Sequence, residues 1–265
     1  MIQNNEVTIL VHGPISLYTI LSLYRYRAEY PMIFVIPKPK IHKKEEVKLL
    51  EELQGIVSKL EYNTTIITYD PYVQQRFDNE QNRYLHFFSV TMGLQICNTP
   101  YVIKLRSDEF YSTLTPMIEA MENSENKIIT NDVFFRKRKD RPIHPSDHLM
   151  GGQTSVFKKV FTVAREYCEN KERFNTNPLV QIALSGPHKT MSAEQVLGIA
   201  ILSSMAEGGV SDDVTLMGKF FEIIPSDKFG FFRIASNSQN TKQYFDSSYF
   251  DNGTDINNIK DYNYE

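Results

Sequence analysis

Short apolar runs rich in β-branched residues alternate with segments of helical period through the first 135 residues of the chain. The strand-like runs lie at 7–11, 32–36, 64–69, 101–105 and 127–130, and the helical segments lie at about 17–24, 43–61, 81–96 and 114–123. This alternation is typical of a wound α/β sheet, in which right-handed crossovers make successive strands parallel. We therefore predict an α/β fold with one Rossmann-like domain and a mostly parallel central sheet.

The spacing of apolar residues also predicts which side of two helices is buried. Leu17, Leu21 and Tyr24 lie at i, i+4 and i+7, so we expect this side of the first helix to face the sheet. In the segment 81–96 the expected buried stripe has four members, namely Leu85, Phe88, Met92 and Ile96.

The pattern loosens after residue 135. A polar loop (136–148) leads to a helix at about 156–169, and an irregular stretch then extends to about 190. Ser192 is a favourable N-cap for a helix at about 193–206, and 220–224 is expected to be a late strand. We expect one domain with a regular half (about 1–135), an irregular half (about 136–235) and a polar tail (236–265).

Composition narrows the class of protein. The 265 residues are 41% hydrophobic, which suffices for one large core, and a net charge of −3 argues against a dedicated nucleic-acid binder. Two cysteines are too few for a disulfide framework. The start of the chain does not resemble a secretory signal, and no apolar run reaches the roughly 20 residues of a membrane span. We expect a cytoplasmic protein with no transmembrane segment.

The segment YVIKLRSDEF (101–110) is the central candidate for chemistry. A hydrophobic strand that ends in Asp108 and Glu109 places two carboxylates at the sheet edge, where hard oxygen ligands suit Mg²⁺ or Mn²⁺. Such an ion would bridge the two phosphates of a nucleotide-sugar and neutralise the leaving group. Arg106 would add a bidentate phosphate contact. The alternative is that both acids only begin the following loop.

Two further groups end strands of the same predicted sheet. His12, Gly13 and Pro14 follow the first strand, and Asp70 follows the third. Because ligands of such sheets bind at the carboxyl ends of the strands, we expect these residues to contact the nucleotide. The alternatives are a helix that begins at Pro14 and a turn that Asp70 initiates.

The residues from 82 to 108 resemble glycosyltransferases of the GT-A fold. Asn82 and Arg83 open a helix, Gly93 lies within it, and the next strand ends at Asp108. The resemblance implies that this helix packs under the nucleotide and that the acidic motif holds metal and diphosphate. It also implies that Arg83 reaches a phosphate, unless it only covers the sheet. Here Arg106 stands where GT-A enzymes have the first acid of Asp-x-Asp.

Four segments narrow the resemblance. TILVHGPI (8–15), GLQICNTPYVIKLRSDEF (93–110), KIITNDVFF (127–135) and HPSDHLMGG (144–152) look like the WavE family of lipopolysaccharide-synthesis glycosyltransferases. The similarity extends over roughly residues 6–205. It implies a GT-A-like fold, a nucleotide-sugar donor and a glycan acceptor, or a related lipid-linked or protein acceptor.

Asp147, His148, Gly151 and Gly152 form the next candidate group. The glycines allow a ligand to approach the backbone, and the Asp–His pair suits acid–base chemistry. In GT-A enzymes a Gly-containing segment at this place lines the donor sugar. The alternative is an Asp-containing turn beside a surface histidine.

Glu194 lies in the first turn of the predicted helix that begins after Ser192. An acid at this relative place in GT-A enzymes removes the proton of the acceptor hydroxyl. The alternative is an acid that only interacts favourably with the helix dipole, and Asp147 is then the second candidate for the base. The basic segment RKRKDR (136–141) is either a solvated loop or a site for an anionic acceptor or membrane surface.

Together these features predict a metal-assisted glycosyltransferase that uses a nucleotide-sugar. Two alternatives stay open. One is a nucleotidyltransferase, although GPISLY (13–18) lacks the Gly-rich loop and the lysine that such enzymes carry early in the chain. The other is a degenerate transferase that binds glycan or a partner without turnover.

Overall fold

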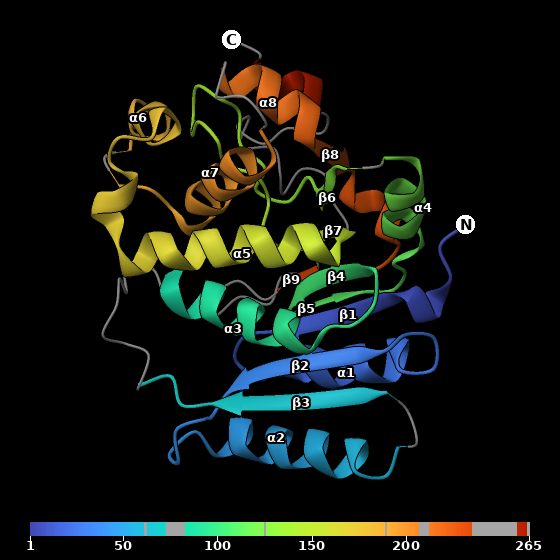
Figure 1. Ribbon diagram of the computed structural model, residues 1–265. Coiled ribbons are helices and arrows are strands. Elements are labelled where there is room, and N and C mark those ends of the chain that lie inside the picture. Colours follow the sequence, from blue (N-terminus) through green and yellow to red (C-terminus); the bar gives the residue numbers. More distant parts are fainter. Residues whose placement is uncertain are drawn as a thin grey trace.

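Within the residues that the computed structural model describes, seven strands form one sheet in the order β3-β2-β1-β4-β7-β6-β8 (Figure 1). Those residues are 1–60, 63–72, 83–124, 126–188, 190–206, 212–234 and 259–263. The strands are β1 (Val7–His12), β2 (Met32–Pro37), β3 (Thr64–Tyr69), β4 (Tyr101–Arg106), β6 (Ile128–Asn131), β7 (Leu149–Gln153) and β8 (Phe221–Ile224). β7 is antiparallel to β4 and β6, and the other neighbours are parallel. The predicted mostly parallel α/β sheet is confirmed.

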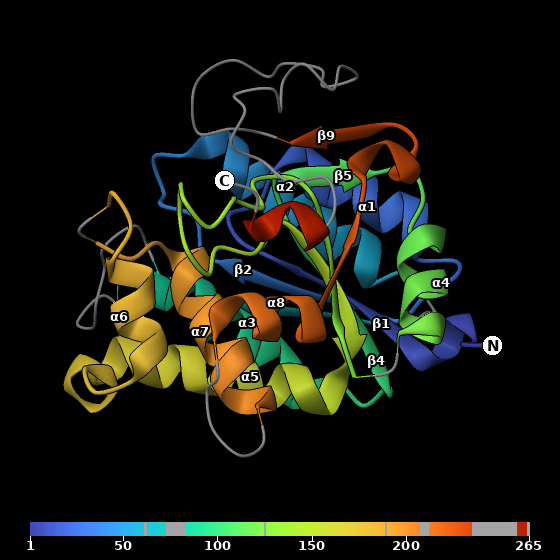
Figure 2. The ribbon, with the colours of Figure 1, turned by 90° about the horizontal axis from the view of Figure 1, so that it is seen from above.

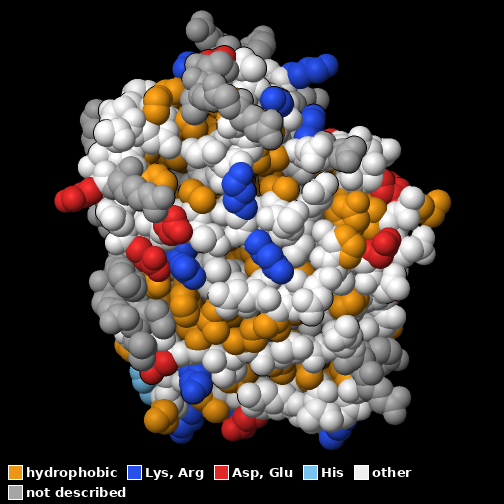
Figure 3. All heavy atoms as spheres, in the orientation of Figure 1, with side chains coloured by type: hydrophobic (Ala, Val, Ile, Leu, Met, Phe, Trp, Pro, Cys, Tyr) orange, Lys and Arg blue, Asp and Glu red, His pale blue; other side chains and the backbone are white. Residues whose placement is uncertain are grey.

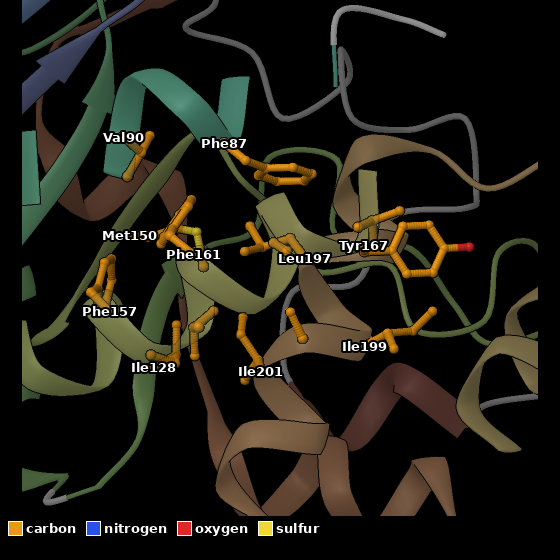
Figure 4. Packing of buried hydrophobic residues seen from close by; sticks show 14 of the residues in the cluster. Phe87, Val90, Ile128, Met150, Phe157, Phe161, Tyr167, Leu197, Ile199 and Ile201 are labelled. Carbon is orange, nitrogen blue, oxygen red and sulfur yellow. The ribbon is translucent and has the colours of Figure 1, made fainter. Parts of the chain in front are cut away.

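Helices cover both faces of this sheet. They are α1 (Leu17–Tyr26), α2 (Lys44–Val57), α3 (Arg83–Ile96), α4 (Thr115–Asn123), α5 (Thr154–Glu169), α6 (Pro178–Leu184), α7 (Ala193–Met205) and α8 (Asp213–Phe220). Figure 2 shows α3, α5 and α7 on one side, and α1, α2 and α4 on the other. Side chains of α3, α5 and α7 meet in one hydrophobic cluster, which includes Phe87, Phe161 and Leu197 (Figure 4).

The predicted buried face of α1 is wrong. Leu17, Leu21 and Tyr24 are 60%, 40% and 51% exposed, whereas Ile20 and Leu23 are buried. Apolar residues occur on several sides of this helix, so spacing alone allowed more than one buried face. The docking of α1 against the sheet selects the other one.

The predicted stripe of α3 is partly wrong. Three of its members are half-buried against the core and Ile96 is 42% exposed, whereas the most buried apolar side chains are Tyr84, Phe87, Val90 and Leu94. α3 packs against the sheet on one side and against its neighbour α5 on another, so two of its sides are covered (Figure 1). Gly93 allows the close approach to the sheet, since a Cβ there would lie 2.3 Å from Cδ1 of Leu10.

The second half is more regular than predicted. α6 and a 3₁₀ helix (Lys171–Phe174) lie in the stretch expected to be irregular, and α8 precedes the predicted strand β8. A separate two-stranded sheet joins β5 (Glu109–Tyr111) to β9 (Phe232–Ile234). α7 begins as predicted, with Ser192 accepting a hydrogen bond from the Gln195 amide.

Near the C-terminus, Ile259–Asn263 form a 3₁₀ helix in which Tyr262 is buried. Residues 236–258 and 264–265 of the predicted polar tail lie outside the described residues. None of the helices in the described part of the chain is both long and apolar enough to cross a bilayer. On the face that Figure 3 shows, Lys and Arg side chains are dispersed among neutral and apolar ones.

Candidate active site

The candidate site lies where β1 and β4 end side by side. The order of the strands reverses between these two, because the chain continues from β1 outward to β2 and β3 and then returns to β4. Crevices at such switch points are the usual ligand sites of parallel sheets. His12 and Arg106 are register partners at the carboxyl ends of β1 and β4. The sheet therefore brings two of the predicted site residues together.

The turn after β1 is joined to the turn after β4. The hydroxyl of Ser107 donates to the carbonyl of Pro14 over 2.6 Å, and Ser16 Oγ donates to the carbonyl of Ser107 over 2.5 Å. Gly13 has a φ of +117°, and a Cβ there would lie 2.7 Å from Ser107 Oγ. Glycine is thus required for the close approach of the two turns. Pro14 is not the first helical residue, since α1 begins at Leu17.

Arg106 binds the carboxylate of Asp108 with two hydrogen bonds of 3.0 Å, from Nε and Nη2. Its Nε also lies 3.3 Å from Oε1 of Glu109. Glu109 is fully buried and accepts hydrogen bonds from the Tyr111 hydroxyl (2.9 Å) and from Nδ1 of His148 (2.5 Å). Both predicted metal ligands are therefore engaged by other side chains.

This arrangement does not fit a divalent cation. An ion at Asp108 would have to displace Arg106, and an ion at Glu109 would have to displace His148. No group of three or more His, Cys, Asp or Glu side chains placed to hold a metal is found in the part of the chain that the structure describes. A metal at Asp108 and Glu109 therefore remains only a prediction from the sequence, and the reaction proposed below uses no metal.

A buried lysine belongs to the same cluster of charged and hydrogen-bonded side chains, which includes Arg106, Glu109, Asp147 and His148. Lys104 is fully buried within β4, and its Nζ donates to the main-chain carbonyl of Asp147. Burial lowers the pKa of Lys104, while the charges of Asp147 and Glu109 act in the opposite direction. Burial alone would raise the pKa of Asp147, but nearby positive charge, above all that of Lys104, lowers it below its usual range. The two side chains stabilise each other's charged form.

Two neutral histidines lie beside this pair. The rings of His12 and His86 meet edge to face with centroids 4.7 Å apart. Nδ1 of His12 lies 3.1 Å from the Ser89 hydroxyl, and Nε2 of His86 lies 3.5 Å from Oδ2 of Asp147. Burial is the main reason that both pKa values are lowered, that of His86 to about 3.

These shifts predict a maximum of stability near pH 6.5. His12 and His86 stay neutral in the folded protein but protonate on unfolding, so the free energy of unfolding decreases below pH 6.5 by about 1.4 kcal/mol per pH unit for each residue. For His148, burial lowers the pKa but Glu109 raises it more, and the net shift is upward. The contribution of His148 to the free energy of unfolding is therefore complete below pH 6.5 and is lost as the pH rises through the folded-state pKa of this residue.

Urea unfolding of the whole chain between pH 4.5 and 8.5 measures this profile. We expect the decrease on the acid side to become shallower in the variant His86→Gln, which has one titrating group fewer. An acid-side slope equal to that of the wild type would contradict the neutral state assigned to His86.

Glu194 is brought to the same cluster by the loop before β7. Oε2 of Glu194 lies 3.6 Å from Nε2 of His144, and the Glu194 side chain is 23% exposed. The side chain of Gln195 donates to the carbonyl of Pro142 over 2.8 Å, which fixes the start of α7 against this loop. The charge of Glu194 also affects the pKa of Lys104. The structure thus places the predicted base beside His144, whose pKa is affected by the charges of both Glu194 and Asp147.

Four of the predicted residues do not join the cluster, namely Asp70, Arg83, Gly151 and Gly152. Asp70 is exposed and accepts a hydrogen bond from the Tyr72 amide at 2.9 Å, as in an Asx turn. Arg83 is buried and donates to the carbonyl of Met191 over 2.6 Å, so it anchors the segment before α7. The contact of Asp70 matches its structural alternative, a turn, whereas Arg83 binds the segment before α7 rather than only covering the sheet. Asn82, its partner in the motif, lies outside the described residues.

Gly151 and Gly152 lie inside β7, and the space beside them is filled by protein rather than open to a ligand. A Cβ on Gly151 would lie 2.9 Å from the Met117 side chain, and one on Gly152 would lie 3.0 Å from the Phe157 ring. The glycines therefore let α4 and α5 pack on opposite faces of this strand.

Sequence reasoning did not identify five members of the cluster. They are His86, Lys104, Tyr111, Asn131 and His144. One signal was available, because a lysine in the middle of the apolar strand YVIKL must be buried with it. No sequence signal indicates the chain of hydrogen bonds that runs from Ser146 to Asn131 (2.7 Å), Tyr111 (3.1 Å) and Glu109 (2.9 Å), since it joins three separate segments.

A family model described as WavE lipopolysaccharide synthesis matches residues 53–214, which is more than half of the chain. The matched range includes Lys104, Arg106, Asp147 and Glu194. No curated protein matches the sequence.

Proposed function

Because the chain belongs to the WavE family of lipopolysaccharide synthesis, we propose that it is a glycosyltransferase. It would transfer a sugar from a nucleotide-diphosphate donor to a glycan or a lipid-linked acceptor. The observation that supports this most is the partly exposed carboxylate of Glu194 beside a buried cluster of charges at the β1–β4 switch point. That combination supplies a base for the acceptor and an electrostatic environment for the leaving group.

The donor side of the proposed site is the edge of the sheet at the two joined turns. The Arg106 side chain is 29% exposed and its partner Asp108 is 22% exposed, so a ligand at this edge could contact both. The guanidinium of Arg106 would bind a phosphate oxygen of the donor and stabilise the negative charge that develops there. His12, Gly13 and Pro14 would line the nucleotide.

The acceptor side has two candidate bases. Nearby positive charge, above all that of Lys104, lowers the pKa of Asp147, and a carboxylate stabilised in its charged form is a weak base. The Asp147 side chain is also only 3% exposed, compared with 23% for Glu194. We therefore assign the base to Glu194 and the role of counter-ion of Lys104 to Asp147.

The proposed step is a direct displacement. The oxygen of the acceptor hydroxyl forms a bond to the anomeric carbon, and Glu194 takes the proton of that hydroxyl. The bond from the anomeric carbon to the diphosphate oxygen breaks, and its electron pair leaves with the nucleoside diphosphate. A single displacement of this kind inverts the configuration of the sugar carbon.

Donor binding gives the first test. We expect one nucleotide-sugar to raise the melting temperature of the wild type in EDTA as well as in Mn²⁺, because Arg106 supplies the positive charge. At 100 times its dissociation constant the ligand should stabilise the fold by about 2.7 kcal/mol. The variant Arg106→Gln should lose most of the shift, and Lys59→Gln, an exposed change beyond the end of α2, should keep it.

The other outcomes are equally informative. A shift that requires Mn²⁺ would assign the diphosphate to a metal at Asp108 after all. Release of pyrophosphate from a nucleoside triphosphate would favour a nucleotidyltransferase. Donor binding without release of the sugar to any acceptor would favour a binding module.

A further inference from the structure

The basic segment 136–141 is held in a defined and strained conformation. It lies between Phe134 and Ile143, which have φ angles of +58° and +55°. A β-branched residue such as Ile143 rarely adopts this backbone, and strain of this kind persists only where surrounding contacts enforce it. Two contacts of Tyr262 do so, since the Ile143 amide donates to its hydroxyl and the Arg138 amide donates to its carbonyl, each over 2.8 Å.

Main-chain contacts place both ends of this segment beside the proposed base. The amide of Arg136 donates to the carbonyl of His144 over 3.1 Å, and the His144 ring lies 3.6 Å from Glu194. Arg141 precedes Pro142, whose carbonyl accepts from the residue after Glu194. The backbone of the segment is therefore held against the start of α7 at both ends, and the Arg141 side chain lies near enough to Glu194 to interact with its charge.

The close packing of α7 keeps this arrangement in place. A Cβ on Gly198 would lie 2.7 Å from the Ile143 carbonyl oxygen and 2.8 Å from Cδ of Pro145. The loop thus lies directly on the helix that carries Glu194. Its position relative to the base depends on packing rather than on a mobile linker.

The charges of the segment are used unequally. Five of its six side chains are basic, and Arg138 is paired with Asp213 at 2.9 Å. Arg136 lies over the Phe134 ring (5.1 Å), and that ring contacts the His148 ring (5.2 Å between centroids). Arg141 is partly buried, and this burial lowers its pKa more than the charge of Glu194 raises it. Among the described residues, no acidic side chain forms an ion pair with the Arg141 guanidinium, whereas Arg138 is paired with Asp213.

We propose that Arg136 and Arg141 bind an anionic group of the acceptor, a phosphate or a carboxylate, next to the hydroxyl that Glu194 deprotonates. Guanidinium groups suit these planar or tetrahedral anions because they donate two parallel hydrogen bonds. The assignment to the acceptor rests on the proposed function, since it follows from the role of Glu194. It narrows the substrate to a glycan that carries negative charge near the site of transfer.

Titration with inorganic phosphate at constant ionic strength tests this subsite. Binding is followed through the melting temperature of the full chain, alone and with the nucleoside diphosphate that the donor screen selects. We expect Arg141→Gln to weaken phosphate binding about tenfold, the effect of losing a charge-assisted contact. We expect Lys139→Gln, an exposed change of equal charge in the same segment, to alter it less than about twofold.

The expected pattern is loss of phosphate binding in Arg141→Gln with unchanged affinity for the nucleotide. Equal effects of Arg141→Gln and Lys139→Gln would overturn the proposal. Displacement of phosphate by the nucleotide in the wild type would also overturn it, because the arginines would then belong to the donor site. If no nucleotide binds, the transferase assignment fails, while the phosphate titration still decides whether the anion subsite exists.

Discussion

Replacing Glu194 with glutamine is expected to lower the rate of sugar transfer by about 10² to 10⁴, the usual contribution of a positioned general base. The side chain keeps its size, so donor binding and the melting temperature should change little. Glutamine cannot take the proton of the acceptor hydroxyl, so the loss should appear in kcat. The measurement is the release of nucleoside diphosphate at saturating donor.

α2 supplies a matched control for this variant. Glu45 is also an acid in the first turn of a helix, and it is exposed and far along the chain from the cluster. The free energy of unfolding should fall by about 0.3–1 kcal/mol in both Glu45→Gln and Glu194→Gln, since each variant loses a favourable interaction with a helix dipole. The rate of transfer should fall in Glu194→Gln alone. If Glu194→Gln transfers sugar at the wild-type rate, Glu194 is only a first-turn acid and the base must be sought elsewhere.

The variant Lys104→Met is expected to destabilise the fold by about 3–5 kcal/mol, because it leaves buried carboxylates without their cation. Lys104 and Glu109 are both fully buried, and Asp147 is nearly so. For a chain of this length the loss corresponds to a fall in melting temperature on the order of 10 °C. Urea unfolding at pH 7 gives the free energy directly.

Two further variants separate the ion cluster from simple loss of a side chain. Lys158 also donates to a main-chain carbonyl, that of Cys97 at 3.0 Å, but it is exposed. Lys158→Met should therefore cost less than about 1 kcal/mol. Adding Asp147→Asn to Lys104→Met should recover part of the lost stability, since it removes the unpaired charge. Additive losses in the double variant would show that the two residues do not compensate each other.

Local sequence signals were sufficient for most of the sheet. Runs such as Val7–His12 and Thr64–Tyr69 are short, apolar and bounded by turn residues, so their position follows from composition and period alone. The cap at Ser192 has a side-chain signature that also acts locally. Local signals do not predict the buried faces of α1 and α3, because both helices have apolar residues on more than one side and only docking selects between them.

In the candidate site, too, some residues could be predicted from local sequence, whereas their contacts depend on packing. Arg106, Asp108 and Glu109 were predicted from the end of one strand, and Asp147 and Glu194 from helix and turn patterns. Their partners depend on β4 lying beside β7 and on α3 covering the carboxyl end of β1. Lys104 meets Asp147, and His12 meets His86, only through this packing. No spacing along the chain encodes such contacts.

If the proposed function is right, a nucleotide-sugar binds at the carboxyl ends of β1 and β4. A crystal structure of the full chain with the nucleotide-sugar that the donor screen selects would show where it binds. We expect density for the diphosphate at Arg106, with the nucleotide along His12 and Gly13 and the sugar carbon facing Glu194. Density for the nucleotide on another face of the molecule, or at another edge of the sheet, would contradict it.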